Sequence, residues 1–218
     1  MAKDWTGNKK STHNTFVTLG SSNHSDGDRE ENDFYATHPS AVEMLCDLET
    51  FNKNILEPCC GQGHISEVLI SRGYNVISHD LVNRGYGEGG HNFLDRTEPF
   101  DGDVITNPPY KYALEFVNKS LELIPVGNKV VMFLKIQFLE GKSRALFFEK
   151  HPPKIVYVSS MRLPCALGGD FIKYGNSTAI CYCWYIWEKE FTGETTLKWF
   201  NKGDKKIETV KDDINNLF

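Results

Sequence analysis

The chain has 218 residues, of which 40% are hydrophobic and 24% charged, and this composition fits one domain with a substantial core. No apolar stretch approaches the length of a membrane span and the N-terminus lacks the apolar core of a signal peptide, so we expect an intracellular protein without a membrane partner. The formal net charge of −5 hides an uneven distribution, because residues 1–104 carry 8 Lys+Arg against 17 Asp+Glu whereas residues 105–206 carry 15 against 9.

The two ends of the chain differ in composition from its middle. Residues 1–32 are polar and lack apolar periodicity, so we expect a disordered or loosely attached tail. The folded domain is expected over residues 33–190. Residues 191–218 are interpreted as a polar C-terminal extension that is too short for a second domain. Within the domain, apolar side chains on one side of residues 39–48 predict the first helix.

A glycine-rich turn follows the first strong apolar strand. The strand leads into Glu57-Pro58-Cys59-Cys60-Gly61-Gln62-Gly63, and a helix is expected from about Ile65 to Ser71. Glycines let the backbone approach a ligand closely, and the helix presents free N–H groups and the positive end of its dipole. The next strand, Asn75 to His79, ends in Asp80, and an acid about 20 positions after such a turn usually holds a ribose diol. The pattern predicts a nucleotide-type cofactor site.

The segment after Asp80 is rich in glycine. Residues 85–90 read Gly-Tyr-Gly-Glu-Gly-Gly and have no apolar side chains to anchor them. We interpret them either as a mobile lip over the cofactor or as a plain surface loop.

A second stiff turn ends the apolar run at residues 104–106. Its sequence is Asn107-Pro108-Pro109-Tyr110, in which the prolines fix the backbone before any substrate arrives. The Asn107 side-chain oxygen and the Pro108 carbonyl can accept both hydrogens of an exocyclic amino group, while Tyr110 can stack on the ring that carries it. Because these acceptors favour a pyramidal nitrogen whose lone pair is available, no strong base is needed before transfer. The turn therefore indicates methylation of a planar amine.

The rest of the chain alternates between helical and extended patterns. We expect helices over residues 112–124 and 143–150, and strands over residues 129–136, 155–159 and 177–188. Alternating strands and helices predict an α/β fold, with a mostly parallel sheet and helices on both faces.

The heptapeptide at 57–63 and the tetrapeptide at 107–110 together are similar to the class I S-adenosylmethionine-dependent methyltransferases. The likeness is to their DNA adenine-N6 branch with the Asn-Pro-Pro-Tyr motif, of the small phage and prophage type, and runs from about residue 33 to residue 190. It implies a Rossmann-like class I methyltransferase fold with a seven-stranded sheet whose last strand, residues 177–188, is antiparallel. It also implies S-adenosyl-L-methionine as cofactor and a cytoplasmic protein, encoded by a phage or prophage in a bacterial host.

The resemblance also assigns site residues. Residues 33–39 resemble the segment that folds over the methionine part of the cofactor, although a negatively charged or small polar residue commonly stands in place of His38. Phe93-Leu94-Asp95 resembles the element whose acid receives the adenine amino group. The cofactor-binding residues predicted in this way are Tyr35, Thr37, Pro39, Glu57, Pro58, Cys59, Gly61, Gly63, His64, Asp80, Asp95 and Asn107, and the catalytic residues are Asn107, Pro108, Pro109 and Tyr110.

Substrate contacts are expected at four residues. They are Tyr110, Lys135 at the edge where the fifth strand ends, and Arg162 and Phe171 in the loop before the last strand; a surface loop with one packed Phe is the alternative for the latter two. The six cysteines (46, 59, 60, 165, 181 and 183) include no Cys-x-x-Cys pair, so we interpret them as reduced thiols and predict no metal site.

The combined prediction is methyl transfer to the N6 amine of adenine in duplex DNA, with the target base flipped out of the stack. Flipping costs a few kcal/mol, and stacking on Tyr110 offsets about 1–3 kcal/mol of that cost. The basic excess after residue 104 lies where phosphates would approach.

Two alternatives stay open. One is an amino-methyltransferase that acts on protein glutamine or on RNA, because the same acceptors serve any planar amide or amine. The other is a binding protein that retains the fold without catalysis. Since we expect no separate target-recognition domain, sequence readout would come from short loops, from the region Leu139–Asp170 or from a second subunit, or would be absent. A homodimer stays open.

Overall fold

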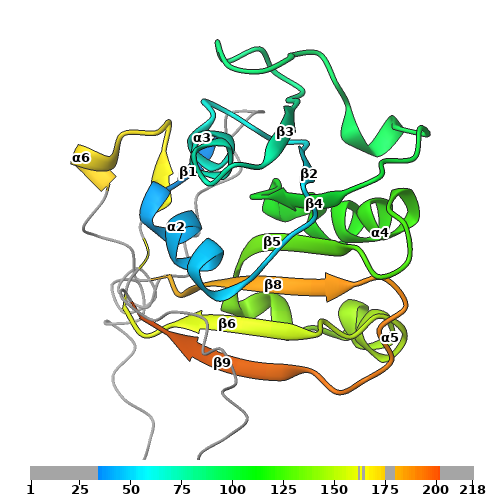
Figure 1. The fold of residues 1–218 in the computed structure, drawn as a ribbon. Helices are drawn as coiled ribbons and strands as arrows, with labels where there is room; N and C mark the ends of the chain where they lie inside the picture. Colours follow the sequence, from blue (N-terminus) through cyan, green and yellow to red (C-terminus); the bar gives the residue numbers. More distant parts are fainter. Residues whose placement is uncertain (1–33, 162, 164, 175–179, 202–218) are drawn as a thin grey trace, which may run out of the picture.

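A computed structural model describes residues 34–161, 163, 165–174 and 180–201; the tail predicted at residues 1–32 and the candidate Arg162 lie outside this part of the chain. Its centre is a seven-stranded sheet with the order β3-β2-β4-β5-β8-β6-β9 (Figure 1). The strands are β2 (Asn54–Glu57), β3 (Asn75–Ser78), β4 (Asp103–Thr106), β5 (Lys129–Lys135), β6 (Ile155–Ser159), β8 (Tyr182–Glu188) and β9 (Thr196–Phe200).

The strand directions confirm the predicted mostly parallel sheet. β3, β2, β4 and β5 run parallel to one another, and β9 is parallel to β6. β8 is antiparallel to both β5 and β6, as predicted for the aromatic segment. It is shorter than the predicted span of residues 177–188, of which residues 177–179 lie outside the described part of the chain.

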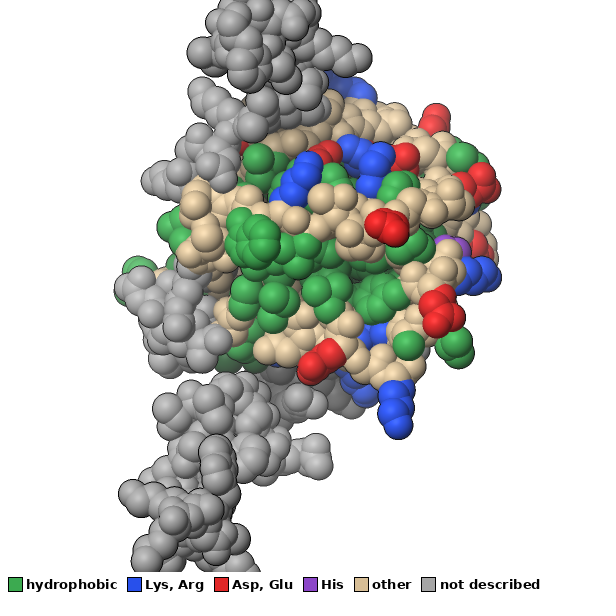
Figure 2. All heavy atoms as spheres, turned by 90° about the horizontal axis from the view of Figure 1, so that it is seen from below, with side chains coloured by type: hydrophobic (Ala, Val, Ile, Leu, Met, Phe, Trp, Pro, Cys, Tyr) green, Lys and Arg blue, Asp and Glu red, His purple; other side chains and the backbone are tan. Residues whose placement is uncertain are grey.

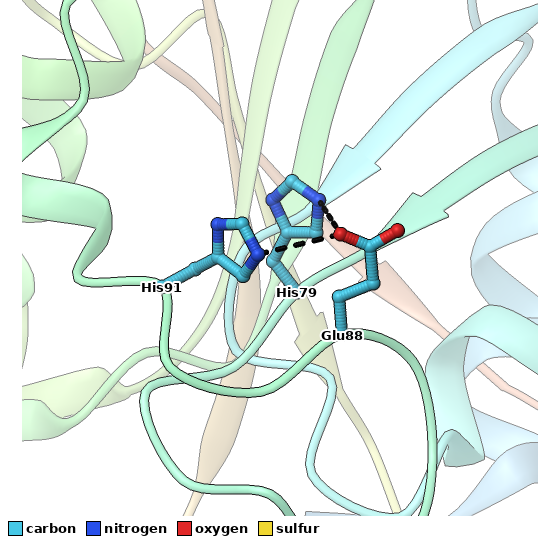
Figure 3. Close-up of side chains that lie close together, drawn as sticks. All are labelled: His79, Glu88 and His91. Atoms are coloured by element: carbon cyan, nitrogen blue, oxygen red, sulfur yellow. Dashed lines mark ion pairs between the residues drawn. The ribbon is translucent and has the colours of Figure 1, made fainter.

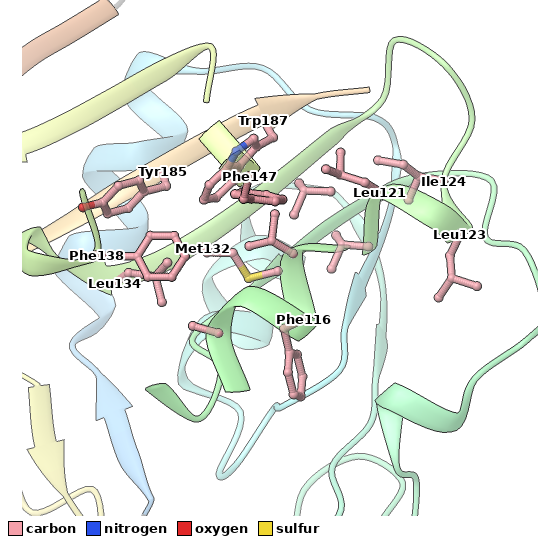
Figure 4. Packing of buried hydrophobic residues seen from close by; sticks show 14 of the residues in the cluster. Phe116, Leu121, Leu123, Ile124, Met132, Leu134, Phe138, Phe147, Tyr185 and Trp187 are labelled. Atoms are coloured by element: carbon pink, nitrogen blue, oxygen red, sulfur yellow. The ribbon is translucent and has the colours of Figure 1, made fainter. Parts of the chain in front are cut away.

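Helices cover both faces of the sheet. α2 (Pro39–Leu48) and α3 (His64–Ser71) pack on one face, and their buried residues share one apolar cluster with side chains of β5 and β8. α4 (Ala113–Leu123) and α5 (Lys142–Lys150) pack on the other face, where a second cluster lies (Figure 4). No helix in the described part of the chain is long and apolar enough to cross a membrane.

The continuous apolar sequence of β5 follows from its central place between two helical layers. Successive side chains of a strand point to opposite faces. Val130, Met132 and Leu134 accordingly enter the cluster beneath α4, whereas Val131 and Phe133 enter the cluster beneath α2 and α3. All five are almost inaccessible to solvent. Full burial of such a side chain stabilises the fold by about 1.5–3 kcal/mol.

A small second sheet joins two segments that are distant in the sequence. β1 (Tyr35–Thr37) pairs antiparallel with β7 (Cys165–Leu167), so that Thr37 lies opposite Cys165. The short helix α6 (Phe171–Tyr174) follows β7. This pairing brings the segment before the first helix and the loop before β8 to the same end of the molecule.

The two edges of the sheet are formed by β3 and β9. Residues 79–102 are all described and contain a short 3₁₀ helix, η1 (Phe93–Asp95), but no strand, so β3 is an edge of the sheet. At the opposite edge, β9 lies within the segment interpreted as a polar extension and follows β8 in the chain. It completes the seven strands because the outer edge of β6 offers backbone groups that a further strand can satisfy.

Candidate active site

The two motifs singled out in the sequence meet at one edge of the sheet. β2 and β4 are parallel neighbours, with Ile55 opposite Asp103 and Leu56 opposite Val104. The glycine turn follows β2 and the Asn107-Pro108-Pro109-Tyr110 turn follows β4. The carboxyl ends of parallel strands lie on the same side of a sheet, which is where α/β proteins bind ligands.

The amide of Asn107 is held in one orientation. Its Nδ2 donates to the Tyr35 carbonyl at 2.8 Å and to the Thr37 hydroxyl at 3.0 Å. Because a carbonyl oxygen only accepts hydrogen bonds, the nitrogen of this amide must face Tyr35, and the amide cannot be flipped. Its Oδ1 has no hydrogen-bond donor among the residues that the structure describes. The role that the sequence predicts for this oxygen, accepting a hydrogen bond from a ligand amine, stays a prediction.

Tyr110 forms part of an aromatic group beside this amide. Its ring centroid lies 6.4 Å from that of Tyr35 and 6.1 Å from that of Tyr182, and Lys135 places Nζ 4.9 Å from it. Burial is the main cause that raises the pKa of the Tyr110 hydroxyl well above its usual value, which keeps it neutral. Tyr110 and Lys135 also line a pocket of about 140 Å³ with Phe138. Both were predicted to contact substrate, and the structure brings them together.

Cys165 completes this corner and was not identified from the sequence. Its Sγ lies 3.7 Å from Asn107 Nδ2 and 3.6 Å from Tyr110 Oη. Burial raises the pKa of the thiol, so the group is a neutral neighbour of the amide rather than a nucleophile. No sequence signal could reveal this contact, because it depends on the pairing of β7 with β1.

The glycine turn is fixed by Asp80. The Asp80 carboxylate accepts from the Gly61 N–H at 2.8 Å and from the Val82 N–H at 2.9 Å. Gly63 has φ 87°, and a side chain there would collide with the ring of Tyr86. The acid predicted to hold a ribose thus also shapes the turn itself.

Glu57 lies behind this turn and is 1% exposed. It accepts a hydrogen bond from Ser66 Oγ, which lies 2.6 Å from Ser78 Oγ. Burial, partly offset by the Ser66 hydrogen bond, raises the pKa of the Glu57 carboxyl to about 8. The interaction ties β2 to α3 and, through Ser78, to β3. Cys59, two residues later, has a thiol pKa that burial raises well above its usual value.

A second pocket, of about 340 Å³, opens beside Pro58. Its wall contains His79 and His91, which lie on either side of the glycine-rich loop of residues 85–90, together with Phe93 and Asp95 of η1. Asp95 accepts from Asn92 Nδ2 at 2.7 Å. The structure therefore places Pro58 and Asp95, two predicted cofactor residues, around one cavity.

The other predicted residues surround the opposite side of the glycine turn. The Phe171 ring lies 5.0 Å from the ring of His38 and 5.3 Å from that of His64. His38 caps α2, in which Pro39 is the first residue, and accepts from the Ser40 N–H at 3.2 Å. Phe171 thus packs over this turn and is not a neighbour of Tyr110 in the aromatic group described above.

No protein-family model matches the chain, and no curated protein matches it. Among solved structures, a predicted O-methyltransferase from Agrobacterium tumefaciens is similar with a TM-score of 0.52 and 11% identity, over 76% of this chain and 90% of that one. A protein described as a modification subunit of a type I restriction enzyme from Vibrio vulnificus has a TM-score of 0.51 and 13% identity, over 83% of this chain and 50% of that one. This chain thus spans about half of the Vibrio protein. The Rossmann-like class I methyltransferase fold predicted from the sequence is confirmed.

The raised pKa of Glu57 predicts a pH dependence of stability. The folded carboxyl keeps its proton to about pH 8, whereas the unfolded one loses it near its ordinary pKa of 4.5, so the free energy of unfolding should fall as pH rises between these values. Glu57→Gln removes this titration while keeping the shape. Denaturant melts of the unliganded protein at pH 5 to 9 should show a steeper decline for the wild type, by up to several kcal/mol at about 1.4 kcal/mol per pH unit. The exposed Glu115→Gln is the control, and equal slopes for the wild type and Glu57→Gln would contradict the assignment.

Proposed function

We propose that this chain transfers the methyl group of S-adenosyl-L-methionine to the exocyclic N6 amine of adenine in DNA. The observation that carries the proposal is the fixed Asn107 amide, whose nitrogen is held by Tyr35 and Thr37 and whose oxygen has no donor among the described residues. An enzyme that must accept N–H hydrogens from a weak nucleophile needs such an oriented acceptor.

The chemistry follows from the two acceptors of the turn. Bound S-adenosylmethionine supplies an electrophilic methyl group on a sulfonium. The amine nitrogen forms its bond to the methyl carbon as the carbon–sulfur bond breaks, and the sulfur keeps that electron pair. Asn107 Oδ1 and the Pro108 carbonyl accept the two N–H hydrogens, which favours a pyramidal nitrogen with its lone pair free to attack. One of these protons leaves to solvent afterwards. Neutral Tyr110 contributes its ring and not a base.

The residues that would hold the cofactor follow β2, β3 and β4 or belong to β1 and η1. The glycine turn and Asp80 would take the ribose and the adjoining atoms, and Asp95 would take the adenine amino group in the pocket beside Pro58. The volume of that pocket, about 340 Å³, falls within the range of small-molecule sites. Tyr35 and Thr37 of β1 would close the site over the methionine part.

Three observations favour adenine in DNA as the acceptor. Tyr110 offers an aromatic ring for a flipped base, and the pocket beside it carries the cations Lys135 and Arg144. The basic excess of residues 105–206 supports approach of a phosphate backbone. The Vibrio neighbour is, by its description, a modification subunit of a type I restriction enzyme. RNA and protein glutamine remain the alternative acceptors, and a non-catalytic role is disfavoured by the oriented amide. A cytoplasmic location in a phage-carrying host remains a prediction from the resemblance.

Asn107→Ala should separate chemistry from cofactor binding. Loss of the acceptor should lower the methyl-transfer rate by about 10²-fold or more, the usual scale for a lost transition-state hydrogen bond, with cofactor affinity changed only a few-fold. Thr37→Val keeps the shape of β1 but frees one side of the Asn107 amide, and should cause a smaller loss of kcat. Single-turnover assays with radiolabelled cofactor on DNA, RNA and protein measure the methyl-transfer rate of both variants. Full activity of Asn107→Ala on every acceptor would rule out the proposed turn chemistry, and label in RNA or glutamine alone would correct the substrate.

Asp80→Ala should weaken S-adenosylmethionine binding. It removes the expected ribose acceptor and also the support of the Gly61 N–H, and a hydrogen bond to a charged group is worth about 1.5–3 kcal/mol. Isothermal titration calorimetry measures the change, with Asp101→Ala, an exposed acid before β4, as the control. Unchanged affinity in Asp80→Ala would move the ribose site elsewhere.

A homodimer is also proposed, through the β9 edge. Leu197 and Trp199 of β9 are 41% and 70% exposed, and hydrophobic side chains gather on the face seen from the β9 side of the sheet (Figure 2). An exposed apolar edge strand is a surface suited to pairing with another chain. Light scattering should find a dimer that Trp199→Lys converts to a monomer; a monomeric wild type at assay concentrations would exclude it.

A further inference from the structure

The chain after β3 contains the glycine-rich loop of residues 85–90 and folds so that the side chains of two histidines and one glutamate lie close together. His79 follows β3, and Glu88 and His91 belong to the loop that returns beside it (Figure 3). His91 Nε2 lies 3.4 Å and His79 Nε2 lies 3.8 Å from the same oxygen of Glu88, Oε2. One ligand atom from each of the three residues can be chosen so that all lie within 4.8 Å of one another.

These separations suit a shared ion better than direct contacts. A good hydrogen bond from a ring nitrogen to a carboxylate is about 2.7–2.9 Å long, and both distances exceed that. Ligand atoms about 2.0–2.2 Å from a tetrahedral ion are roughly 3.3–3.6 Å apart, close to the two distances found. The histidine rings are stacked, with centroids 4.0 Å apart and planes 9° apart, so a turn of one ring about its χ2 bond is needed to make the nitrogen lone pairs converge.

The backbone around the three side chains is already fixed. The Glu88 N–H donates to the Ser78 carbonyl at 2.9 Å, and the Asp80 N–H donates to the Glu88 carbonyl at 2.9 Å. The His91 N–H then donates to the Asp80 carbonyl at 3.0 Å. Gly87 permits this close approach, since a side chain there would meet the Ser78 carbonyl oxygen at 2.4 Å. Only side-chain rotations separate the arrangement from a complete ligand set.

We propose that His79, Glu88 and His91 bind one divalent transition-metal ion of the Zn²⁺ type, with water in the fourth position. Imidazole and carboxylate are the ligands that Zn²⁺ takes in sites with an open position, and two imidazoles with one carboxylate is a known set. Glu88 and His91 are exposed, with 74% and 46% of their side chains accessible, so an ion can enter from solvent.

A bound ion would hold the glycine-rich loop of residues 85–90 against β3, the edge strand of the sheet. Residues 79–102 supply no strand beyond β3, and the loop pairs with the residue after β3 through an isolated bridge between His79 and Glu88. His79 and His91 also line the 340 Å³ pocket, so the clamp would set one wall of that cavity. This inference does not depend on the proposed reaction.

The test is titration of the full chain, freed of metal by chelation, with Zn²⁺ followed by calorimetry and by thermal melts. The wild type should bind one ion at this site and melt at higher temperature with Zn²⁺, since a ligand of the folded state stabilises it. Glu88→Gln and His91→Ala, both at exposed positions, should each weaken binding by about tenfold or more, because loss of even an outer partner costs roughly 10–100-fold.

Control variants and the spectrum of a Co²⁺-loaded sample distinguish this site from metal binding by other histidines or by cysteines. His151→Ala should bind as the wild type does, and so should the pair His13→Ala and His24→Ala in the N-terminal segment. Co²⁺ in place of Zn²⁺ should show ligand-field bands without a thiolate charge-transfer band. Absence of binding, unchanged affinity in both Glu88→Gln and His91→Ala, or a thiolate band that persists in these variants would each overturn the proposal.

Discussion

The candidate site depends on one hydrogen bond between distant parts of the chain, from Asn107 Nδ2 to the Tyr35 carbonyl. Asn107 follows a central strand of the sheet, whereas Tyr35 belongs to a three-residue strand that, in the described part of the chain, pairs only with β7. The bond and the Thr37 hydroxyl beside it fix the direction of the amide. They also tie the β1–β7 sheet over the end of β4. Without them the acceptor oxygen of Asn107 would rotate freely, and a weakly nucleophilic amine would meet no oriented acceptor.

The same β1–β7 pairing explains the surroundings of Tyr110. It places Cys165 against both the Asn107 amide and the Tyr110 hydroxyl, and the neighbouring Tyr182 of β8 packs against the same ring. Burial keeps the thiol and the phenol protonated. Lys135, whose ammonium lies over the Tyr110 ring, is the charged neighbour of this ring among the described residues. Such a corner suits a planar, neutral ring more than an anionic group.

Two acids at the end of β2 and β3 have opposite environments and separate tasks. Glu57 is buried against Ser66 and holds α3 to the strands, which raises its pKa to about 8. Asp80 accepts two backbone N–H groups and thereby shapes the turn that follows Glu57. The glycine-rich loop after Asp80 is also held in place by backbone hydrogen bonds. They join it to the end of β3, which is an edge strand of the sheet.

The sequence by itself predicted the elements whose signals are local. The heptapeptide at the end of β2, the stiff turn after β4 and the apolar runs of β5 and β8 are visible as spacing, because period and turn chemistry act over a few residues. The parallel sheet followed from the alternation of these elements, and the neighbouring ends of β2 and β4 followed from the sheet. The tertiary structure decided what depends on pairing between distant segments: β1 with β7, β9 with β6, and the loop with β3. Cys165 lies beside the Asn107 amide, and His79 lies near Glu88 and His91, because of such pairings. The free energy of these pairings comes from contacts between distant residues, which no local window of sequence contains.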